Sequence, residues 1–249
     1  MTNDLFNHRT IRKYKPDAVS SAILEQILLA GIRASNTGNM QVYSIIITRE
    51  KDIKDKLWEI HFKQDMVRQA PLLLTFCADF NRFVKWCIQR KANPGYDNFL
   101  SFFTAAIDAL LVAQNIAIAA ESFGLGICYL GTTTYQADPI CKILDLPGGV
   151  VPVTSLVIGY PDETPDLTER LPLKAVIHHE TYHDYSPTDI DELYAEKDQS
   201  VLTHELITIN QKETLAQIFT DIRYSKHDNV LFSKSFLEVI KNQGFMNND

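Results

Sequence analysis

The chain has 249 residues, and its 24 Lys and Arg against 31 Asp and Glu give a formal net charge of −7 at pH 7. Hydrophobic residues make up 45% of the sequence and charged residues 22%, which are globular proportions and exclude a mainly disordered or fibrous chain. The acidic balance argues against a nucleic-acid-binding protein.

The cysteines and the N-terminal residues indicate whether disulfides or structural metal sites are expected and where in the cell the protein is located. Cys77, Cys87, Cys128 and Cys141 form no Cys-x-x-Cys pair, so we expect neither a disulfide framework nor a structural metal site. Reduced thiols, and a start without a basic and then apolar segment, predict a cytoplasmic protein. Polar residues interrupt the most apolar stretch, residues 99–123, so we predict no membrane span.

In the first half of the chain, apolar periodicity predicts two helices and two strands. A helix follows Ser20 and ends near Gly31, and another occupies residues 51–60. Residues 43–48 are β-branched, and residues 71–78 form a short apolar run typical of a strand buried on both faces. These elements alternate helix, strand, helix, strand.

The middle of the chain predicts a long central helix over residues 97–123, which is apolar nearly all round and ends at Gly124. A short helix over 136–144 and a β-branched strand over 153–160 follow it. A proline-containing loop comes next, at residues 161–172.

The remainder of the chain predicts helices. One contains Leu215 to Ile222, and a second begins at Ser235, where Glu238 completes a capping box, and ends at Gly244. No Gly/Ser-rich linker divides the sequence, so we expect a single domain over 1–249 with a helical C-terminal extension over about 186–249. The layout favours an α+β fold: a central mixed, mostly antiparallel sheet enclosed by helices.

A group of cations precedes the first helix. Arg9 and Arg12 are three residues apart and could converge on one anion, with a hydroxyl donor from Thr10, because a guanidinium matches a phosphate or carboxylate bidentately. A solvated basic segment is the more frequent meaning of such a pattern.

Two loops offer polar and backbone groups to a ligand. The segment from Ser35 to Gln41 is small and polar, which suits either a binding loop or an ordinary connection. The segment from Gly124 to Thr132 does not have the dinucleotide-binding glycine spacing, and predicts instead a helix end, a short strand and a turn with free N–H groups. Arg170 precedes Leu171-Pro172, where the proline restricts the backbone of Leu171 to an extended conformation. Arg170 is either a second residue that binds the anion or an ordinary surface charge.

Other polar residues suggest no catalytic group. His178, His179 and His183 lack the order of a zinc protease, and no nucleophile elbow is present. Asp108, in the long apolar helix, is a candidate buried carboxylate, for which a hydrogen-bonded structural role is the commoner explanation.

Taken in order, these segments resemble the FMN-dependent nitroreductase family, and most closely its NADPH-dependent, oxygen-insensitive nitroreductase and flavin reductase branch. The resemblance runs from about residue 8 to residue 182. The strings that carry it are His8–Arg12, Phe76–Arg82, Ala113–Asn115, Ala119–Ser122, Gly124–Gly126, Tyr129–Gly131, Pro165–Leu167 and Arg170–Pro172.

The resemblance implies a nitroreductase-like fold that works as a homodimer, with FMN at the subunit interface and NADPH or NADH as electron donor. It implies hydride transfer through the flavin, no catalytic side chain, and a nitroaromatic, quinone or flavin as acceptor. It places the phosphate and ribityl ligands near the N-terminus, the 35–41 loop partly on the flavin of the second subunit, and a backbone N–H of the 129–131 turn on flavin N5. The implied cofactor-binding residues are His8, Arg9, Thr10, Arg12, Ser35, Asn36, Thr37, Gln41, Gln64, Tyr129, Leu130, Gly131 and Arg170.

The sequence departs from the family pattern at two places: Thr168 stands where this branch usually carries a Lys, and the loop from Arg33 to Gln41 is one residue shorter than in close relatives. In the C-terminal part, Lys212 and Arg223 are the nearest candidates for a 2′-phosphate. The alternatives within the same fold are a module that binds FMN without fast catalysis and a specialised flavoenzyme with narrow or slow reductase activity.

Overall fold

The computed structural model describes residues 5–247. The chain divides into two compact units: one comprises the chain up to Asp166 together with the segment from Phe232 onward, and the other comprises Leu167–Leu231. The second unit therefore begins before the predicted extension at residue 186, and it ends before the C-terminus.

The first unit is built on a four-stranded sheet of order β1-β2-β4-β3, in which every neighbouring pair is antiparallel. The α+β fold with a sheet enclosed by helices is as the sequence predicts, and the sheet itself is antiparallel throughout; one isolated parallel bridge, between Thr10 and Ile127, places the N-terminal segment beside β3. The strands are β1 (Tyr43–Thr48), β2 (Leu72–Asp79), β3 (Gly126–Leu130) and β4 (Val150–Gly159).

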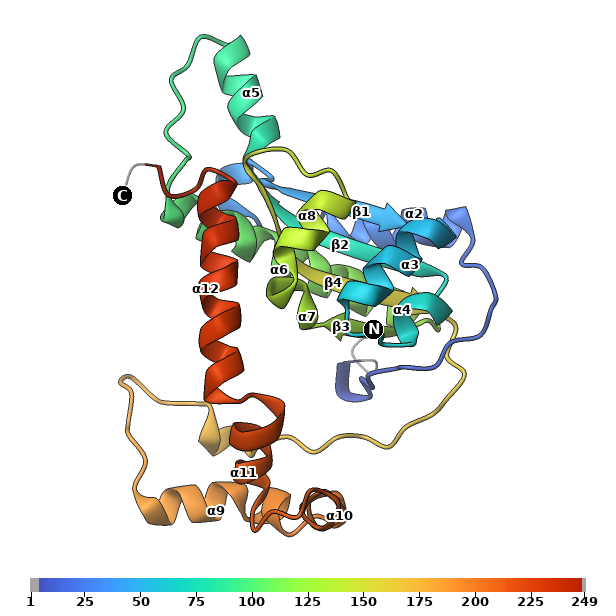
Figure 1. Ribbon diagram of the computed structural model, residues 1–249, viewed down its shortest axis with the longest axis vertical. Helices are drawn as coiled ribbons and strands as arrows, with labels where there is room; N and C mark the ends of the chain where they lie inside the picture. Colours follow the sequence, from blue (N-terminus) through green and yellow to red (C-terminus); the bar gives the residue numbers. More distant parts are fainter. Residues whose placement is uncertain (1–4, 248–249) are drawn as a thin grey trace. The chain divides into compact units, whose positions relative to one another are not determined.

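Helices cover both faces of the sheet (Figure 1). Alternate residues of β2 point to opposite faces, as the pleat requires: Leu72 and Leu74 belong to one core cluster and Leu73 to the other. The first cluster includes α2 (Ser21–Gly31) and α6 (Phe99–Ser122). The second includes α3 (Lys51–Ile60), α4 (Met66–Gln69) and α8 (Ala137–Ile143).

The central helix α6 has the predicted length within two residues at its start and one at its end. Asn98 caps it by accepting a hydrogen bond from the backbone N–H of Ser101, and Gly124 follows its end at φ +75°. By length and composition α6 could cross a membrane, but half of its most apolar window is buried inside the fold, as in the core helix of a globular domain.

Further helices complete this unit. Helix α5 (Asn81–Gln89), which the sequence analysis did not predict, extends away from the sheet with the loop that follows it (Figure 1). The C-terminal part of α12 (Lys226–Asn242) belongs to a third core cluster, in which Val239 and Phe245 pack with Phe80 and Phe102. A turn-like helix, α7 (Thr132–Tyr135), follows β3.

The second unit is helical. Ser186 and Asp189 form a capping box at the start of its first long helix. Its elements are η2 (Leu173–Ala175), α9 (Pro187–Asp198), α10 (Val201–Asn210), α11 (Leu215–Ile218) and a π-turn at Phe219–Arg223.

The predicted start of the last helix at Ser235 is wrong. Helix α12 begins at Lys226, because Ser225 and Asp228 make the reciprocal cap instead, and Ser235 lies inside the helix. The helix predicted over 215–222 is likewise shorter, since the chain widens into the π-turn after Ile218.

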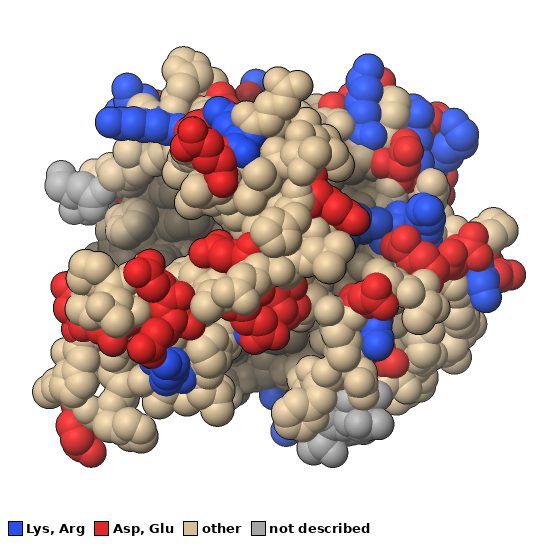
Figure 2. Space-filling view, turned by 90° about the horizontal axis from the view of Figure 1, so that it is seen from below, with Lys and Arg blue, Asp and Glu red and all other residues tan. Residues whose placement is uncertain are grey.

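Charge is distributed in keeping with the acidic composition. On the face that Figure 2 shows, basic side chains are interspersed with acidic ones, and the acidic side chains form the larger groups.

Candidate functional site

The N-terminal cation segment lies along β3. The backbone N–H of Ile11 donates to the carbonyl of Ile127 at 2.9 Å, next to the bridge at Thr10. Gly126 makes this approach possible, because a Cβ at that position would lie 2.6 Å from Cγ1 of Ile11. The glycine noted in the sequence thus serves close packing of the segment that carries Arg9 and Arg12.

Arg9 and Arg12 differ in the hydrogen bonds that their guanidinium groups make. The Nε of Arg9 donates to the carbonyl of Pro165 at 2.8 Å and one Nη donates to the carbonyl of Asn7 at 3.0 Å, which hold the guanidinium beside a hollow of about 200 Å³. The side chain of Arg12 is exposed and forms no hydrogen bond or ion pair with any residue between 5 and 247. One cation is therefore fixed and the other is free to take an anion.

Acidic groups brace the same segment. Oε1 of Glu163 accepts hydrogen bonds from the backbone N–H groups of Arg12, at 2.5 Å, and Lys13, at 3.1 Å. Nδ1 of His8 lies 2.6 Å from Oε1 of Glu121, which ties the start of the segment to the end of α6. His8 is thus held by a carboxylate at the edge of the hollow that Arg9 lines.

The 129–131 turn presents backbone rather than side chains. Leu130 is buried, whereas Gly131 is exposed, and a Cβ there would meet nothing within 4 Å. The hydroxyl of Tyr129 donates to Oε1 of Gln114 at 3.3 Å, and burial raises the pKa of Tyr129, so it stays a neutral phenol. The turn can therefore be approached closely by a flat ligand that uses main-chain hydrogen bonds.

Gln64 lies beside this turn in a small polar cluster that sequence reasoning missed. Nε2 of Gln64 donates to the carbonyl of His61 at 2.9 Å and to Oγ1 of Thr132 at 3.4 Å, and Nδ1 of His61 lies 2.6 Å from the same Oγ1. His61 is fully buried, and burial lowers its pKa to about 4, so the imidazole is neutral at pH 7. Phe62 and Lys63 both have φ of +55°, a left-handed turn that brings His61 and Gln64 together.

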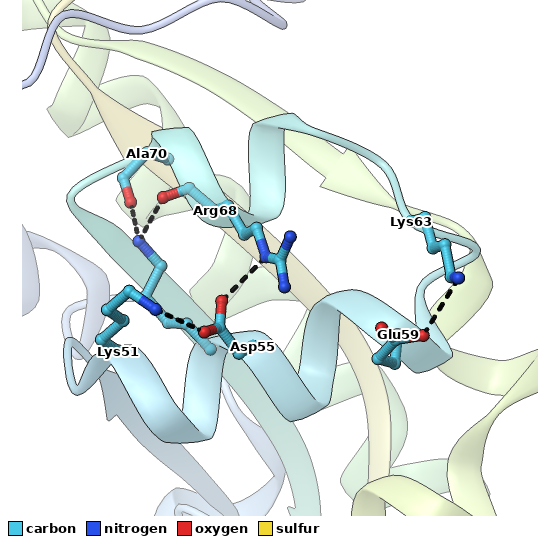
Figure 3. A network of polar contacts seen from close by, with 7 residues as sticks. Lys51, Asp55, Glu59, Lys63, Arg68 and Ala70 are labelled. Carbon is cyan, nitrogen blue, oxygen red and sulfur yellow. Dashed lines mark hydrogen bonds and ion pairs between the residues drawn. The ribbon is translucent and has the colours of Figure 1, made fainter.

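An ionic network holds the two helices that flank this turn (Figure 3). Asp55 on α3 accepts from Nζ of Lys51 at 2.7 Å and from Nε of Arg68 on α4 at 2.8 Å. The hydrogen bond from Lys51 lowers the pKa of Asp55. Nζ of the buried Lys54 donates to the carbonyls of Arg68 and Ala70. These bonds fix the α3–α4 connection and hence the position of Gln64.

The loop at residues 35–41 is built differently. The backbone N–H and the hydroxyl of Thr37 both donate to Oδ1 of Asp108 on α6, at 2.9 and 3.2 Å. Oδ1 of Asn36 accepts from the backbone N–H of Gln41, which has a φ of +53°, while Ser35 is exposed. The loop is thus rigid and presents hydroxyl and amide groups to its surroundings.

The register of the sheet separates this loop from the N-terminal cations. The loop enters β1 at Tyr43, which pairs with Ala78 at one end of the sheet, while Gly126 pairs with Gly159 at the other end. Strands β1 and β3 are also the two edges of the sheet, about 14 Å apart at the usual strand spacing. One chain therefore brings His8, Arg9, Thr10, Arg12, Gln64 and the 129–131 turn to one edge, and leaves the 35–41 loop at the opposite corner.

Arg170 belongs to the second unit, where one Nη donates to the carbonyls of Thr168 and Glu169. In the same unit, Nζ of Lys212 pairs with Asp221 at 2.8 Å, and Arg223 lies against the ring of Phe219. Within residues 5–247, no three side chains of His, Cys, Asp or Glu lie close enough together to hold a metal ion. This includes His178, His179 and His183.

Aromatic side chains gather near the turn. The rings of Tyr135 and Phe232 stack with centroids 4.5 Å apart at an interplanar angle of 6°, and Phe62 lies 6.3 Å from Phe232. Phe62 is 52% exposed. Tyr135 follows Thr132 in α7 by three residues, so this aromatic group adjoins the polar cluster of Gln64 and His61.

Comparisons with known proteins bear on the family and on the fold. The nitroreductase family model matches residues 5–160. An NADPH-dependent oxidoreductase of Staphylococcus aureus is 33% identical over 216 residues, which cover 84% of this chain and 85% of that protein. A Bacteroides fragilis protein of known crystal structure is 49% identical with a TM-score of 0.97, covering 98% of this chain and 100% of that one. The NfrA1 nitroreductase of B. subtilis is 27% identical with a TM-score of 0.87, covering 99% of each chain.

Proposed function

Because this chain belongs to the nitroreductase family and is an NADPH-dependent oxidoreductase, we propose that it binds FMN and passes electrons from NADPH or NADH to a nitroaromatic, quinone or free flavin. The observation that carries the proposal is the edge of the sheet at β3. The N-terminal segment with Arg9, Thr10 and Arg12 lies along this strand, which ends at the open turn of Gly131.

The cation segment suits the phosphate end of FMN. Arg9 is held in place by two carbonyls, so it can bind an anion without first losing side-chain freedom, and Arg12 adds a second, unpaired charge. The hydroxyl of Thr10 would serve as a further donor. Glu163 fixes the backbone of Arg12 through its own carboxylate, which keeps the segment extended along β3.

The glycine turn suits the ring end. Thr10 faces Ile127, and Leu130 lies three residues further along β3, about 10 Å away at the usual rise of a strand. That separation matches the span of a five-carbon ribityl chain between a phosphate and a tricyclic ring. The exposed Gly131 then offers a backbone N–H near N5, with Gln64 held beside it by His61 and Thr132.

FMN, when bound, supplies the hydride transfer at N5. The chain binds, orients and shields the reacting rings, and we assign no catalytic acid or base. The titratable groups beside the turn support this assignment: the pKa of Tyr129 is raised and that of His61 is lowered to about 4, so both are neutral and neither exchanges a proton near pH 7.

A second copy of the chain would complete the site. The 35–41 loop carries Ser35, Asn36, Thr37 and Gln41 at the corner of the sheet opposite to Arg9, out of reach of the same flavin. One side of α6 is also exposed and apolar at helical spacing, a pattern that favours a helix face buried in a homodimer. Its exposed residues are Phe99, Leu100, Phe103, Ile107, Leu110 and Leu111.

Planar acceptors fit the aromatic group. Phe62, Tyr135 and Phe232 can stack against a flat π-system whatever substituents it carries. This favours an enzyme that accepts quinones, nitroaromatics and flavins alike. Arg170, Lys212 and Arg223 stay predictions for the phosphates of FMN or of the nucleotide. A cytoplasmic location is proposed on the four free thiols.

Anaerobic titration of the purified protein tests the proposal. We expect a yellow protein that binds one FMN per chain and whose visible absorbance bleaches with one equivalent of NADPH or NADH, then recovers on addition of a quinone or nitroaromatic. FMN binding without reduction by either nucleotide would favour a flavin-binding module instead. A protein that takes up no FMN on reconstitution would contradict the proposal.

A further inference from the structure

Asp108 is an acidic residue in the middle of the long, largely apolar helix α6. It is 1% exposed, and its neighbours along α6 are Ala and Ile or Leu. Burying a carboxylate is unfavourable unless it is compensated by hydrogen bonds, so its presence there calls for an explanation.

The contacts of Asp108 point to the 35–41 loop. Oδ1 accepts two hydrogen bonds from one residue, the backbone N–H and the hydroxyl of Thr37. Among the described residues, Oδ2 is buried and has no hydrogen-bond partner. The hydrogen bonds of the carboxylate are therefore directed to the 35–41 loop, through Oδ1.

Asp108 joins the loop to the rigid core. The loop's other side-chain bonds are internal, as between Asn36 and Gln41, or come from Arg82 on α5, whose guanidinium donates to the carbonyl of Gln41. Arg82 and Gln41 line a hollow of about 500 Å³ at this corner of the sheet. Among the hydrogen bonds of the described residues, those from Thr37 to Asp108 link the 35–41 loop to α6, while Met40 packs against a core cluster that includes apolar residues of α6.

We propose that Asp108 is a positioning residue that acts across the dimer: by fixing Thr37 it presents the 35–41 loop to the flavin bound along β3 of the second copy. The inference rests on the proposed function, since it assumes FMN and a dimer. Its new content is the residue and the direction of its effect, from one chain to the site of the other.

The first experiment compares Asp108→Ala, Asp108→Asn and Thr37→Val with the wild type by FMN dissociation constant and by thermal unfolding of the apoprotein. Loss of two hydrogen bonds to a carboxylate is expected to weaken FMN binding in D108A about tenfold to hundredfold. D108N, which keeps an accepting oxygen, should lie between D108A and the wild type, and T37V should lose only part of the affinity. Asp138→Asn on α8, where Asp138 pairs with the exposed Lys142, is the matched carboxylate-to-amide control and should bind FMN normally.

The second experiment is complementation. D108A chains and chains carrying both Arg9→Ala and Arg12→Ala are given different tags, dissociated, mixed and purified as mixed dimers. If Asp108 acts across the dimer, one site in each mixed dimer has both an intact cation segment and an intact loop, so one FMN per dimer binds with wild-type affinity.

Two results would overturn the inference. Mixed dimers without any tight site would show that Asp108 serves its own chain, and D108A and T37V both binding FMN like the wild type would show that the contact does not position the loop. Because T37V alters an exposed side chain, it tests the loop even if D108A does not fold. A wild-type protein that binds no FMN would instead refute the proposed function.

Discussion

The two edges of the sheet present different chemical groups. At the β3 edge, cations and main-chain groups lie along an extended segment and an open turn, with Arg9 fixed and Arg12 free. At the β1 edge, the 35–41 loop carries no Lys or Arg and is held by the buried carboxylate of Asp108. The difference suggests a division of work: one edge supplies affinity for an anion, and the other supplies neutral donors and acceptors to a second copy.

Breaking the proposed dimer should have the largest effect, because it would separate the β3 edge of one copy from the 35–41 loop of the other. Ile107→Glu places a charge on the exposed apolar side of α6, where burial without a partner costs several kcal/mol, and we expect the dimer dissociation constant to rise about a thousandfold. Sedimentation velocity measures the change, and FMN affinity should fall with it. Ile209→Glu, at an equally apolar but 76% exposed position of the second unit, is the control.

Removing the guanidinium groups of Arg9 and Arg12 should weaken FMN binding at the β3 edge and leave the proposed dimer intact. The double change Arg9→Ala with Arg12→Ala eliminates charge-assisted bonds to the phosphate, and FMN affinity should drop about hundredfold or more at low salt. Riboflavin, which lacks the phosphate, should bind the wild type and the variant equally. Lys15→Ala, another exposed cation of this segment, should have little effect. A variant that loses FMN and riboflavin alike would show that the cations act on the fold instead.

His61 should make stability depend on pH. Its pKa is about 4 in the folded chain, below the ordinary 6.5, so the unfolded state binds more protons between these values and stability falls as pH drops through this range. The loss should total about 3 kcal/mol by pH 4 and be absent above pH 7. Urea unfolding of the wild type and His61→Gln across pH 4–7 measures it; equal slopes for the two proteins would contradict the assignment.

The aromatic group should have the smallest effect, and one confined to the acceptor. Phe232→Ala removes the ring that stacks on Tyr135, and kcat/KM for a quinone should fall about two- to tenfold. The rate of flavin reduction by NADPH should hold, as measured by stopped-flow absorbance. An equal fall in both half-reactions would indicate that Phe232 supports the flavin site as a whole.

Much of the sheet could be predicted from sequence because its strands are continuous apolar or β-branched runs, and α6 because its pattern persists for over twenty residues. Helix α5 was missed although it is amphipathic, because it spans only nine residues. Helices α9 and α10 were missed although Ser186 and Ser200 are N-caps visible in the sequence. The late start assigned to α12 arose because the Ser-x-x-acid signal at Ser235 was used and the earlier one at Ser225 was overlooked.

The candidate site could be predicted only where it is local. Arg9, Thr10 and Arg12 stand close together in sequence, whereas the cluster of His61, Gln64 and Thr132 joins residues about seventy positions apart. A histidine three residues before Gln64, and a hydroxyl directly after Gly131, were the available signals. That the 35–41 loop lies opposite to Arg9 depends on strand order, which periodicity does not specify.

The central claim is that each flavin is held by both edges, one from each copy. Sedimentation of the FMN-loaded protein over a dilution series, followed at the visible absorbance of the flavin, tests it most directly. The account predicts that bound flavin sediments only with the dimer and that flavin is released as the monomer forms. Flavin sedimenting tightly bound to a monomer would contradict it.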